Sequence, residues 1–248
     1  MKIINRPPFL LVVAAAAWVA IGSVLPCVAT AEDTGKPTTS PDAARSPVAY
    51  PRIGMLWSPI RDDWSMKSFA RHDLIMMGQG ALGLKPDTEP QGLATGFSEE
   101  SIRVAEQRIA EIKRLNRHAV ILADLLFYEY PDDWLPEDHP WWLRKDGERL
   151  QFWPGTHRMD WGQVEYRRKV VQQTVALKRI GVDGVFYDNL RDEPEPWVAF
   201  LTAVRTAVGE DFLILANAGY AVGDYDFAAP FLNGVMYESG WSHGRSDW

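Results

Sequence analysis

Two short stretches of this chain run from a glycine through apolar residues to a carboxylate. They are residues 184–188, which read GVFYD, and residues 234–238, which read GVMYE. Each pattern predicts a short, buried β-strand with an acid at its carboxyl end. Two carboxyl groups can cleave a glycosidic bond: one protonates the leaving oxygen, and the other attacks the anomeric carbon or activates water. Asp188 and Glu238 are therefore the candidates for this chemistry.

The sequence neighbours of the two acids favour different roles. Asn189 and Arg191 adjoin Asp188 and favour its ionised form, which a nucleophile or base requires. Trp241 lies near Glu238, and less solvated surroundings suit a general acid. The sequence therefore assigns Asp188 as nucleophile or base and Glu238 as acid.

Polar side chains also end two other predicted strands. Asp124 follows the apolar run 119–123, and Asn217 follows the run 212–216. A single acid after a strand is most often the N-cap of the next helix, but polar residues at four successive strand ends are not explained in that way. In a barrel such side chains converge above one core. The expected substrate contacts are hydroxyl-binding Asp124, Asn189 and Asn217, and sugar-stacking Trp57, Tyr128 and Trp241.

The elements that must position these side chains alternate between strands and helices. Runs that are apolar throughout predict strands, and apolar residues at helical spacing predict helices between them. The predicted strands are 53–58, 74–77, 119–123, 184–187, 212–216 and 234–237, and the predicted helices are 98–115, 160–180 and 197–208. Strands without a polar face indicate a parallel sheet covered by helices. We expect Asp183, at the amino end of its strand, to have a structural role only.

Two architectures fit this alternation, an open doubly wound sheet and a (β/α)8 barrel of the TIM-barrel type. Long segments after the strands, including 125–159, and polar strand ends favour the barrel, whose sites form at that face. Six strands are visible where a closed barrel has eight, so we expect a barrel truncated after the sixth strand. A complete six-stranded sheet is the alternative.

The first part of the chain has the pattern of a secretory signal. Lys2 and Arg6 precede the apolar run 9–25, and a small-residue motif predicts cleavage after Ala31. The alternative is an uncleaved membrane anchor. We expect a signal peptide at 1–31, a disordered linker at 32–50 and a glycoside hydrolase-like barrel domain, C-terminally incomplete, at 51–248. The protein is then secreted or periplasmic, without stable membrane insertion after cleavage.

Several other functions are disfavoured. The net charge of -7 disfavours nucleic acid as a partner. The five histidines show no tight ligand spacing, so we expect no metal and no other cofactor. Residues 78–83 read GQGALG, as in a dinucleotide-binding turn, but Pro86 and Pro90 prevent the long helix that such a turn requires. No Gly-x-Ser-x-Gly motif is present.

Five segments together resemble glycoside hydrolase barrels of unassigned specificity. They are 142–147 (WLRKDG), 159–160 (MD), 181–189 (GVDGVFYDN), 215–219 (LANAG) and 233–238 (NGVMYE). The sequence resembles the hypothetical glycosyl hydrolase family numbered fifteen, which is similar in plan to the endo-α-1,4-polygalactosaminidase group. The resemblance covers about residues 53–241.

The resemblance implies a (β/α)8 fold and cleavage of a polysaccharide. In such barrels an acid after the fourth strand often serves as nucleophile or base, with an acid from a later strand, which matches Asp188 and Glu238. The alternatives are a non-catalytic carbohydrate-binding barrel and a barrel enzyme of other chemistry, such as a lyase. A carboxyl separation of about 5–5.5 Å predicts a retaining enzyme, and about 6.5–9.5 Å an inverting one.

Overall fold

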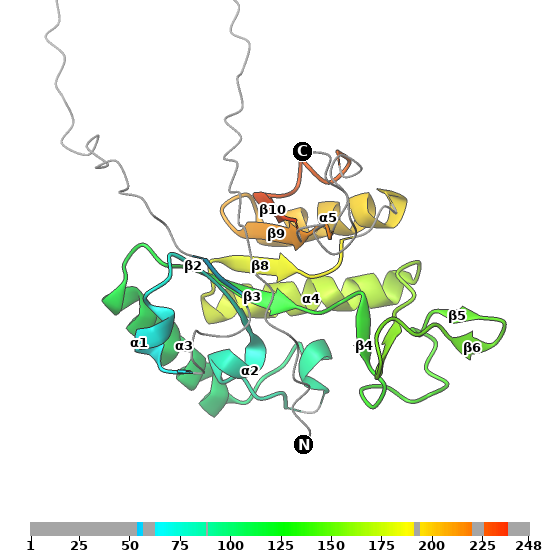
Figure 1. Ribbon diagram of the computed structural model, residues 1–248, viewed down its shortest axis with the longest axis horizontal. Coiled ribbons are helices and arrows are strands. Elements are labelled where there is room, and N and C mark those ends of the chain that lie inside the picture. Colours follow the sequence, from blue (N-terminus) through cyan, green and yellow to red (C-terminus); the bar gives the residue numbers. More distant parts are fainter. Residues whose placement is uncertain (1–53, 57–62, 88, 191–193, 220–225, 238–248) are drawn as a thin grey trace, which may run out of the picture.

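A six-stranded parallel sheet forms the centre of the protein. The computed structural model describes residues 54–56, 63–87, 89–190, 194–219 and 226–237 (Figure 1). The strands of the sheet are β1 (Gly54–Leu56), β2 (Leu74–Gly78), β3 (Val120–Leu125), β8 (Gly184–Tyr187), β9 (Leu213–Asn217) and β10 (Gly234–Met236).

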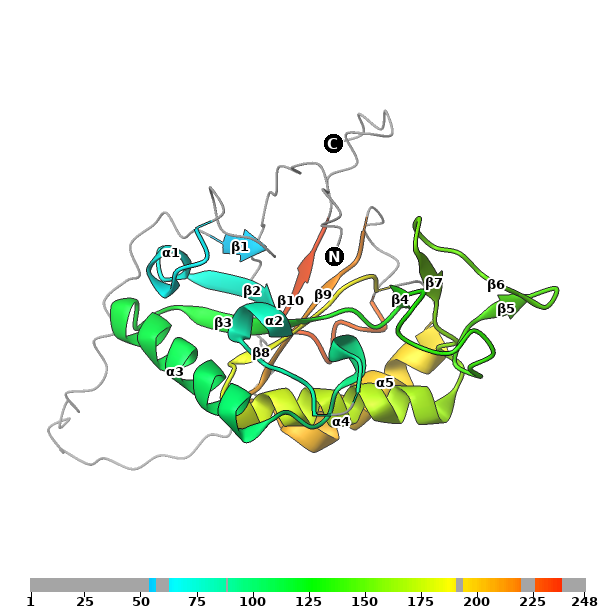
Figure 2. The same cartoon turned by 90° about the horizontal axis from the view of Figure 1, so that it is seen from below.

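The strands lie side by side in the order in which they occur along the chain, β1-β2-β3-β8-β9-β10. A doubly wound sheet would reverse direction at a switch point, and this sheet does not. It curls, so that β1 and β10 rise on the same side of the other strands (Figure 2). The described part of the chain therefore has the (β/α) barrel architecture that the sequence predicts, with six strands in a half-barrel.

Three long helices cover the outer face of the curled sheet (Figure 2). They are α3 (Glu99–Leu115), α4 (Val164–Ile180) and α5 (Pro194–Val208). The predicted start of α3 is confirmed, with Ser98 as its N-cap: the Ser98 side chain accepts a hydrogen bond from the Ser101 N–H at 3.3 Å. The predicted end of α4 is confirmed too, because Gly181 takes the left-handed conformation (φ 100°) that ends many helices.

α4 starts later than the helix predicted over 160–180. The helix begins at Val164, with Gln163 as an N-cap whose side chain makes no capping bond. Asp160 instead closes the turn before the helix, where it accepts hydrogen bonds from the Gly162 N–H at 3.0 Å and the Gln163 amide at 2.8 Å. Aspartate is common both as a helix N-cap and in tight turns. Here the Asp160 side chain closes the turn and does not cap the helix.

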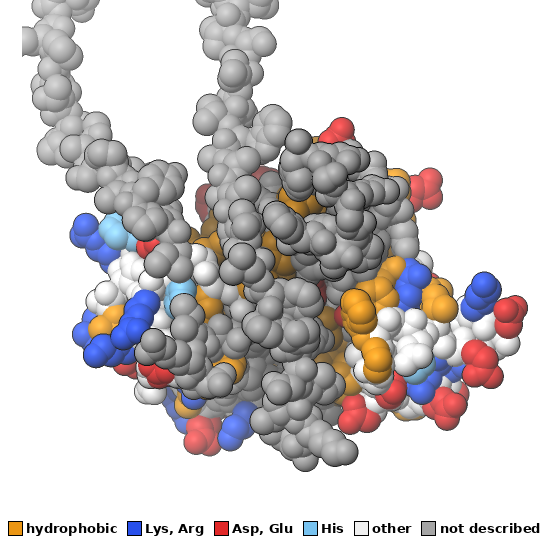
Figure 3. Space-filling model, viewed as in Figure 1, with side chains coloured by type: hydrophobic (Ala, Val, Ile, Leu, Met, Phe, Trp, Pro, Cys, Tyr) orange, Lys and Arg blue, Asp and Glu red, His pale blue; other side chains and the backbone are white. Residues whose placement is uncertain are grey.

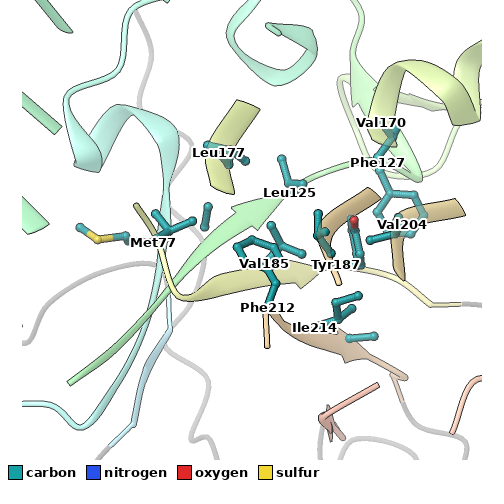
Figure 4. Packing of buried hydrophobic residues seen from close by; sticks show 14 of the residues in the cluster. Met77, Leu125, Phe127, Val170, Leu177, Val185, Tyr187, Val204, Phe212 and Ile214 are labelled. Atoms are coloured by element: carbon teal, nitrogen blue, oxygen red, sulfur yellow. The ribbon is translucent and has the colours of Figure 1, made fainter. Parts of the chain in front are cut away.

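Successive residues of the strands pack on opposite faces of the sheet, as the pleat requires. The outer face carries the larger core, in which side chains such as Val185, Tyr187 and Ile214 point toward α4 and α5 (Figure 4). The inner face carries a separate cluster of Met76, Leu122, Phe186 and Met236. Two buried faces explain why the strands have no polar face.

The segment between β3 and α4, which the sequence predicts as a long loop, contains short antiparallel strands. One pair joins β4 (Glu129–Pro131) to β7 (Thr156–Arg158), and a second joins β5 (Arg144–Lys145) to β6 (Glu148–Arg149). We call residues 126–163 the β3–α4 excursion. Its first pair lies beyond the carboxyl ends of the central strands (Figure 1).

Three short helical segments complete the described fold. They are α1 (Met66–Phe69), α2 (Gln79–Leu82) and the 3-10 helix η3 (Gln91–Leu93). α2 occupies the glycine-rich segment predicted as a loop, but it is a single turn that Gly83 ends at φ 88°. Within the described ranges, no helix is both long enough and apolar enough to cross a bilayer.

Candidate active site

A buried carboxylate and a buried amide meet at the carboxyl ends of β8 and β9. The side chain of Asn217 donates a hydrogen bond to Asp188 Oδ1 at 2.8 Å, and the two residues are 1% and 6% exposed. The other end of the Asn217 amide accepts the Gly219 N–H at 2.8 Å. That second bond fixes which end of the amide carries the NH2 group, so Asn217 presents a donor to Asp188.

The backbone around Asp188 is tied to both neighbouring strands. Its N–H donates to the carbonyl of Leu125 in β3 at 3.3 Å, and the Leu190 N–H donates to the carbonyl of Asn217 in β9 at 2.7 Å. The register places Tyr187 beside Leu125 and Ala216. Asp188 comes two residues after Phe186, so its side chain lies on the same, inner face of the sheet.

Asn189 takes an unusual backbone conformation directly after Asp188. Its φ is 68°, in the left-handed region. Its side-chain amide donates to both carboxylate oxygens of Glu129, at 3.2 Å to Oε1 and 3.1 Å to Oε2. The sequence places Asn189 beside Asp188, and the structure shows that its amide binds a different acid. Arg191, the other expected neighbour of Asp188, lies outside the described residues.

Glu129 is a site residue that the sequence reasoning missed. It belongs to β4 and is 2% exposed. The register of the β4–β7 pair sets it opposite Arg158. A signal was present, because an acid between Tyr128 and Tyr130 interrupts an otherwise apolar run. The signal of Glu129 is weak in the sequence because residues 125–159 as a whole have the pattern of a loop.

Asp124 and Tyr128 lie on the β3 side of the site. Asp124 is a residue of β3 itself, level with Phe186 in β8, and shares the inner-face parity of Leu122. Tyr128 is 3% exposed, and the Arg158 guanidinium lies 4.6 Å from its ring centroid. The proposed contacts of these two residues with substrate stay predictions.

Three of the predicted site residues lie outside the described residues. They are Glu238, Trp57 and Trp241. The separation between the carboxyl groups of Asp188 and Glu238 is therefore a prediction still. Met236, two residues before Glu238, lies on the inner face and is level with Asn217.

The described residues offer no set of metal ligands. No group of three or more His, Cys, Asp or Glu side chains could hold a metal ion in this part of the protein. His157 Nδ1 pairs with Asp132, and partial burial lowers the pKa of His139, with the nearby Asp138 acting in the opposite direction. Among the described residues, the groups gathered at the site are carboxylates, amides, aromatic rings and the Arg158 guanidinium.

The comparisons with known proteins concern the fold. No protein-family model matches the chain, and no curated protein matches it in sequence. A variant of the glycoside hydrolase domain of PelA from Pseudomonas aeruginosa has a similar structure, with a TM-score of 0.51 at 13% identity over 74% of this chain and 65% of that chain. A noncanonic maltogenic alpha-amylase, AmyB from Thermotoga neapolitana, matches with a TM-score of 0.47 at 13% identity over 70% of this chain and 42% of that chain.

These structural neighbours are glycoside hydrolases, and the chain spans less than two thirds of the length of either one. At this identity the similarity to the PelA domain supports the barrel fold, and it assigns no residue or substrate.

Proposed function

We propose that the protein is a glycoside hydrolase that cleaves O-glycosidic bonds of a polysaccharide. Asp188 serves as nucleophile or base and Glu238 as the acid. The observation that carries the proposal is the setting of Asp188: a 6% exposed carboxylate at the carboxyl end of a barrel strand, oriented by an amide. Barrel enzymes place their catalytic groups at this end of the sheet, and a buried acid there is an expensive feature for packing alone.

The resemblance of residues 181–189 and 233–238 to the hypothetical glycosyl hydrolase family numbered fifteen supports the same proposal. In barrels of this plan the second acid comes from a later strand than the first, which matches the place of Glu238 in the sequence. We include Asp124, Asn189 and Asn217 as groups that contact sugar hydroxyls. Trp57 and Trp241 are proposed stacking surfaces.

An aromatic row leads from the site to the surface and supports a long substrate. Tyr128 packs against Phe152 with ring centroids 5.4 Å apart, and Phe152 packs against Trp153 at 5.3 Å. Trp153 is 56% exposed. Figure 3 shows hydrophobic side chains gathered on this side of the molecule, next to the charged tip that contains β5 and β6. Exposed aromatic faces suit the apolar faces of sugar rings.

The test is a screen of the full chain against plant, bacterial and animal polysaccharides, including α-1,4-linked galactosaminoglycans, with release of reducing ends as the readout. We expect activity on at least one polymer, and a loss of about a thousandfold in Asp188→Asn and Glu238→Gln. Affinity electrophoresis on the same polymers separates the alternatives. One such outcome is a polymer that retains the protein and is degraded at the same rate by Asp188→Asn and by the unaltered chain. That result would indicate a non-catalytic carbohydrate-binding barrel, with the cleavage due to a contaminating hydrolase. Products with a terminal double bond would indicate a lyase.

We also propose that the protein is exported and that cleavage follows Ala31. The basic start and the apolar run 9–25 support this proposal. Amino-terminal sequencing of the protein recovered outside the cytoplasm should begin at Glu32. A species that keeps Met1 and sediments with membranes would favour the uncleaved anchor.

A further inference from the structure

The turn that follows β8 is held from two sides. On the β9 side Asn217 binds Asp188, and on the β3 side Glu129 binds Asn189. We infer that Glu129 is a positioning residue, which sets the orientation of Asp188 by fixing the conformation of Asn189. The inference rests on the proposed function for its catalytic consequence, although the contact itself is a property of the protein alone.

The backbone of Asn189 has a conformation that few residues other than glycine adopt. Two residues other than glycine have positive φ among the described residues, Asp146 at 53° and Asn189 at 68°. Asp146 precedes Gly147 (φ 88°) in the tight turn between β5 and β6, where paired positive φ angles are the usual solution. Asn189 connects a strand to a helix, so no hairpin requires its conformation. Unusual φ values that persist without such a reason point to function.

The group that binds the Asn189 amide is a buried carboxylate. Glu129 is 2% exposed, and a buried carboxylate is unfavourable unless other groups compensate for the loss of water. Both of its oxygens face the Asn189 amide at 3.2 and 3.1 Å, so both act as acceptors. The two contacts therefore tie the side chain of Asn189 to β4.

Asp188 and Asn189 are consecutive residues. Fixing the side chain and φ of Asn189 fixes the peptide plane between the two residues, and with it the direction of the Asp188 side chain relative to Asn217. The hydrogen bond from Leu190 N–H to the Asn217 carbonyl, 2.7 Å, closes the turn on the β9 side. Loss of Glu129 leaves Asn189 free to return to a commoner φ, and the carboxylate of Asp188 then rotates away from its position.

The experiment compares the full chain with Glu129→Ala, Glu129→Gln, Asn189→Gly and the double variant Glu129→Ala/Asn189→Gly. Glycine takes a positive φ without strain. The double variant therefore keeps the conformation of the turn although the hydrogen bonds between residues 129 and 189 are absent. Asp183→Ala is the matched control, because it removes an acid from the other end of the same strand. The first readout needs no substrate: the side-chain amide signals of Asn189 and Asn217 in a 15N–1H spectrum, assigned by their loss in Asn189→Gly and Asn217→Asp.

We expect Glu129→Ala to shift the amide signals of both Asn189 and Asn217, and Asp183→Ala to shift neither. On a polymer found in the screen, Glu129→Ala should lower kcat about 10- to 100-fold with KM within about twofold, as expected for a misplaced catalytic group. Glu129→Gln, which keeps one acceptor oxygen, should recover most of that loss. In the Asn189→Gly background the same change of Glu129 should lower kcat by less than about threefold, because coupled residues are not additive.

Two results would overturn the inference. One is an Asn217 signal that stays in place in Glu129→Ala. The other is an equal fall in kcat from Glu129→Ala with and without Asn189→Gly. A chain that cleaves no polymer in the screen contradicts the proposed function, and the two amide signals then decide the positioning role by themselves.

Discussion

The two ends of β8 carry an aspartate each, and the two are held in different ways. Asp183, at the amino end, accepts hydrogen bonds from Lys113 Nζ at 2.6 Å and from the Ile121 N–H at 2.7 Å. Its own N–H donates to the Ile121 carbonyl at 2.9 Å. The side chain of Asp183 thus takes the place of a backbone carbonyl and extends the ladder between β3 and β8 by one rung.

Asp188, at the carboxyl end, has a bond that extends no ladder. Asn217 donates to it from the side chain, across the inner face of the sheet. Asp188 is 6% exposed, whereas the side chains of Lys113 and Asp183 are 32% and 31% exposed. The comparison teaches that the partner of an acid indicates its role more clearly than its place in the sequence does. The side chain of Asp183 completes the backbone ladder, so the fold explains it. The bond from Asn217 to Asp188 completes no ladder, so Asp188 needs another explanation.

The largest expected effect comes from exchanging each acid for its amide. Asp188→Asn should lower the rate of polymer cleavage about a thousandfold, because the amide can serve neither as nucleophile nor as base. Asp183→Asn should leave that rate within about twofold, since it lies at the opposite end of the strand. Initial rates of reducing-end release and urea unfolding should be measured on both variants. Equal losses of activity in the two variants would contradict a catalytic role that belongs to the carboxyl end of β8 alone.

The glycines that begin β8 and β10 provide the next comparison. A Cβ at Gly184 would collide with the Leu213 carbonyl and lie 2.8 Å from Leu122 Cδ2, whereas a Cβ at Gly234 would be 3.4 Å from its nearest neighbour, Leu215 Cγ. Gly184→Ala should therefore destabilise the protein by about 3 kcal/mol, the upper range for overpacking. Gly234→Ala should change the free energy of unfolding by less than about 1 kcal/mol. Urea unfolding measures both, and a smaller effect at Gly184 would contradict the close approach of β8 to β9.

The structural role of Asp183 predicts a smaller loss of stability. Asp183→Ala removes the acceptor of the Ile121 N–H and the partner of Lys113, and we expect a loss of about 1–2 kcal/mol in unfolding free energy. Because the ion pair is about one third exposed, it contributes little to this figure. Lys113→Met should accordingly cost less than half as much. If Lys113→Met were the more damaging change, the contacts of Lys113 with Asp183 and with the Ala119 carbonyl would contribute more than the added rung of the ladder.

Two exposed tryptophans extend the comparison to the surface. Trp153 is 56% exposed in the β3–α4 excursion, and Trp64 is 50% exposed just before α1, which lies at the far end of the sheet (Figure 1). Trp153→Ala should weaken retention by a polymer about five- to tenfold, roughly 1 kcal/mol of stacking. Trp64→Ala should leave retention unchanged in affinity electrophoresis. Equal effects would show that exposure alone, and not position, determines binding.

The sequence predicted the central sheet well because buried parallel strands are apolar on both faces. All six predicted strands occur, within a few residues, and their order follows from the barrel interpretation. The excursion was not predicted. Its strands are two or three residues long, and Arg144 and Lys145 are both exposed, so they show no alternation for a pattern to detect.

The same limit applies to the site. Asp188, Asn217 and Asp124 could be proposed from the sequence because each ends or nearly ends an apolar run. Glu129 was missed because its contact with Asn189 joins segments 60 residues apart, and it depends on how the excursion folds back over the barrel. Tertiary contacts of this kind leave no periodic signal along the chain.

The smallest effect concerns Tyr187, which precedes Asp188 but faces the outer core. Burial raises the pKa of its hydroxyl far above the usual 10.0, with Thr174, whose Oγ1 lies 2.7 Å from that hydroxyl, acting in the opposite direction. Because the pKa is raised in the folded state, the contribution of the neutral Tyr187 hydroxyl to the free energy of unfolding is fully present below about pH 10. It is lost as the pH rises further, because only the unfolded chain then ionises at this residue.

Tyr187→Phe should therefore cost less than about 1 kcal/mol at pH 7, since Thr174 Oγ1 also bonds the Val170 carbonyl at 2.9 Å. Above pH 10 the variant should lose stability more slowly than the unaltered chain, by about 1.4 kcal/mol per pH unit for one proton. Urea unfolding at pH 8 and pH 11 measures the difference, and polymer cleavage at pH 7 should stay within about twofold. Parallel pH profiles, or a large loss of cleavage, would mean that the outer face of β8 takes part in the site and that function at this end of the strand is not confined to the inner face.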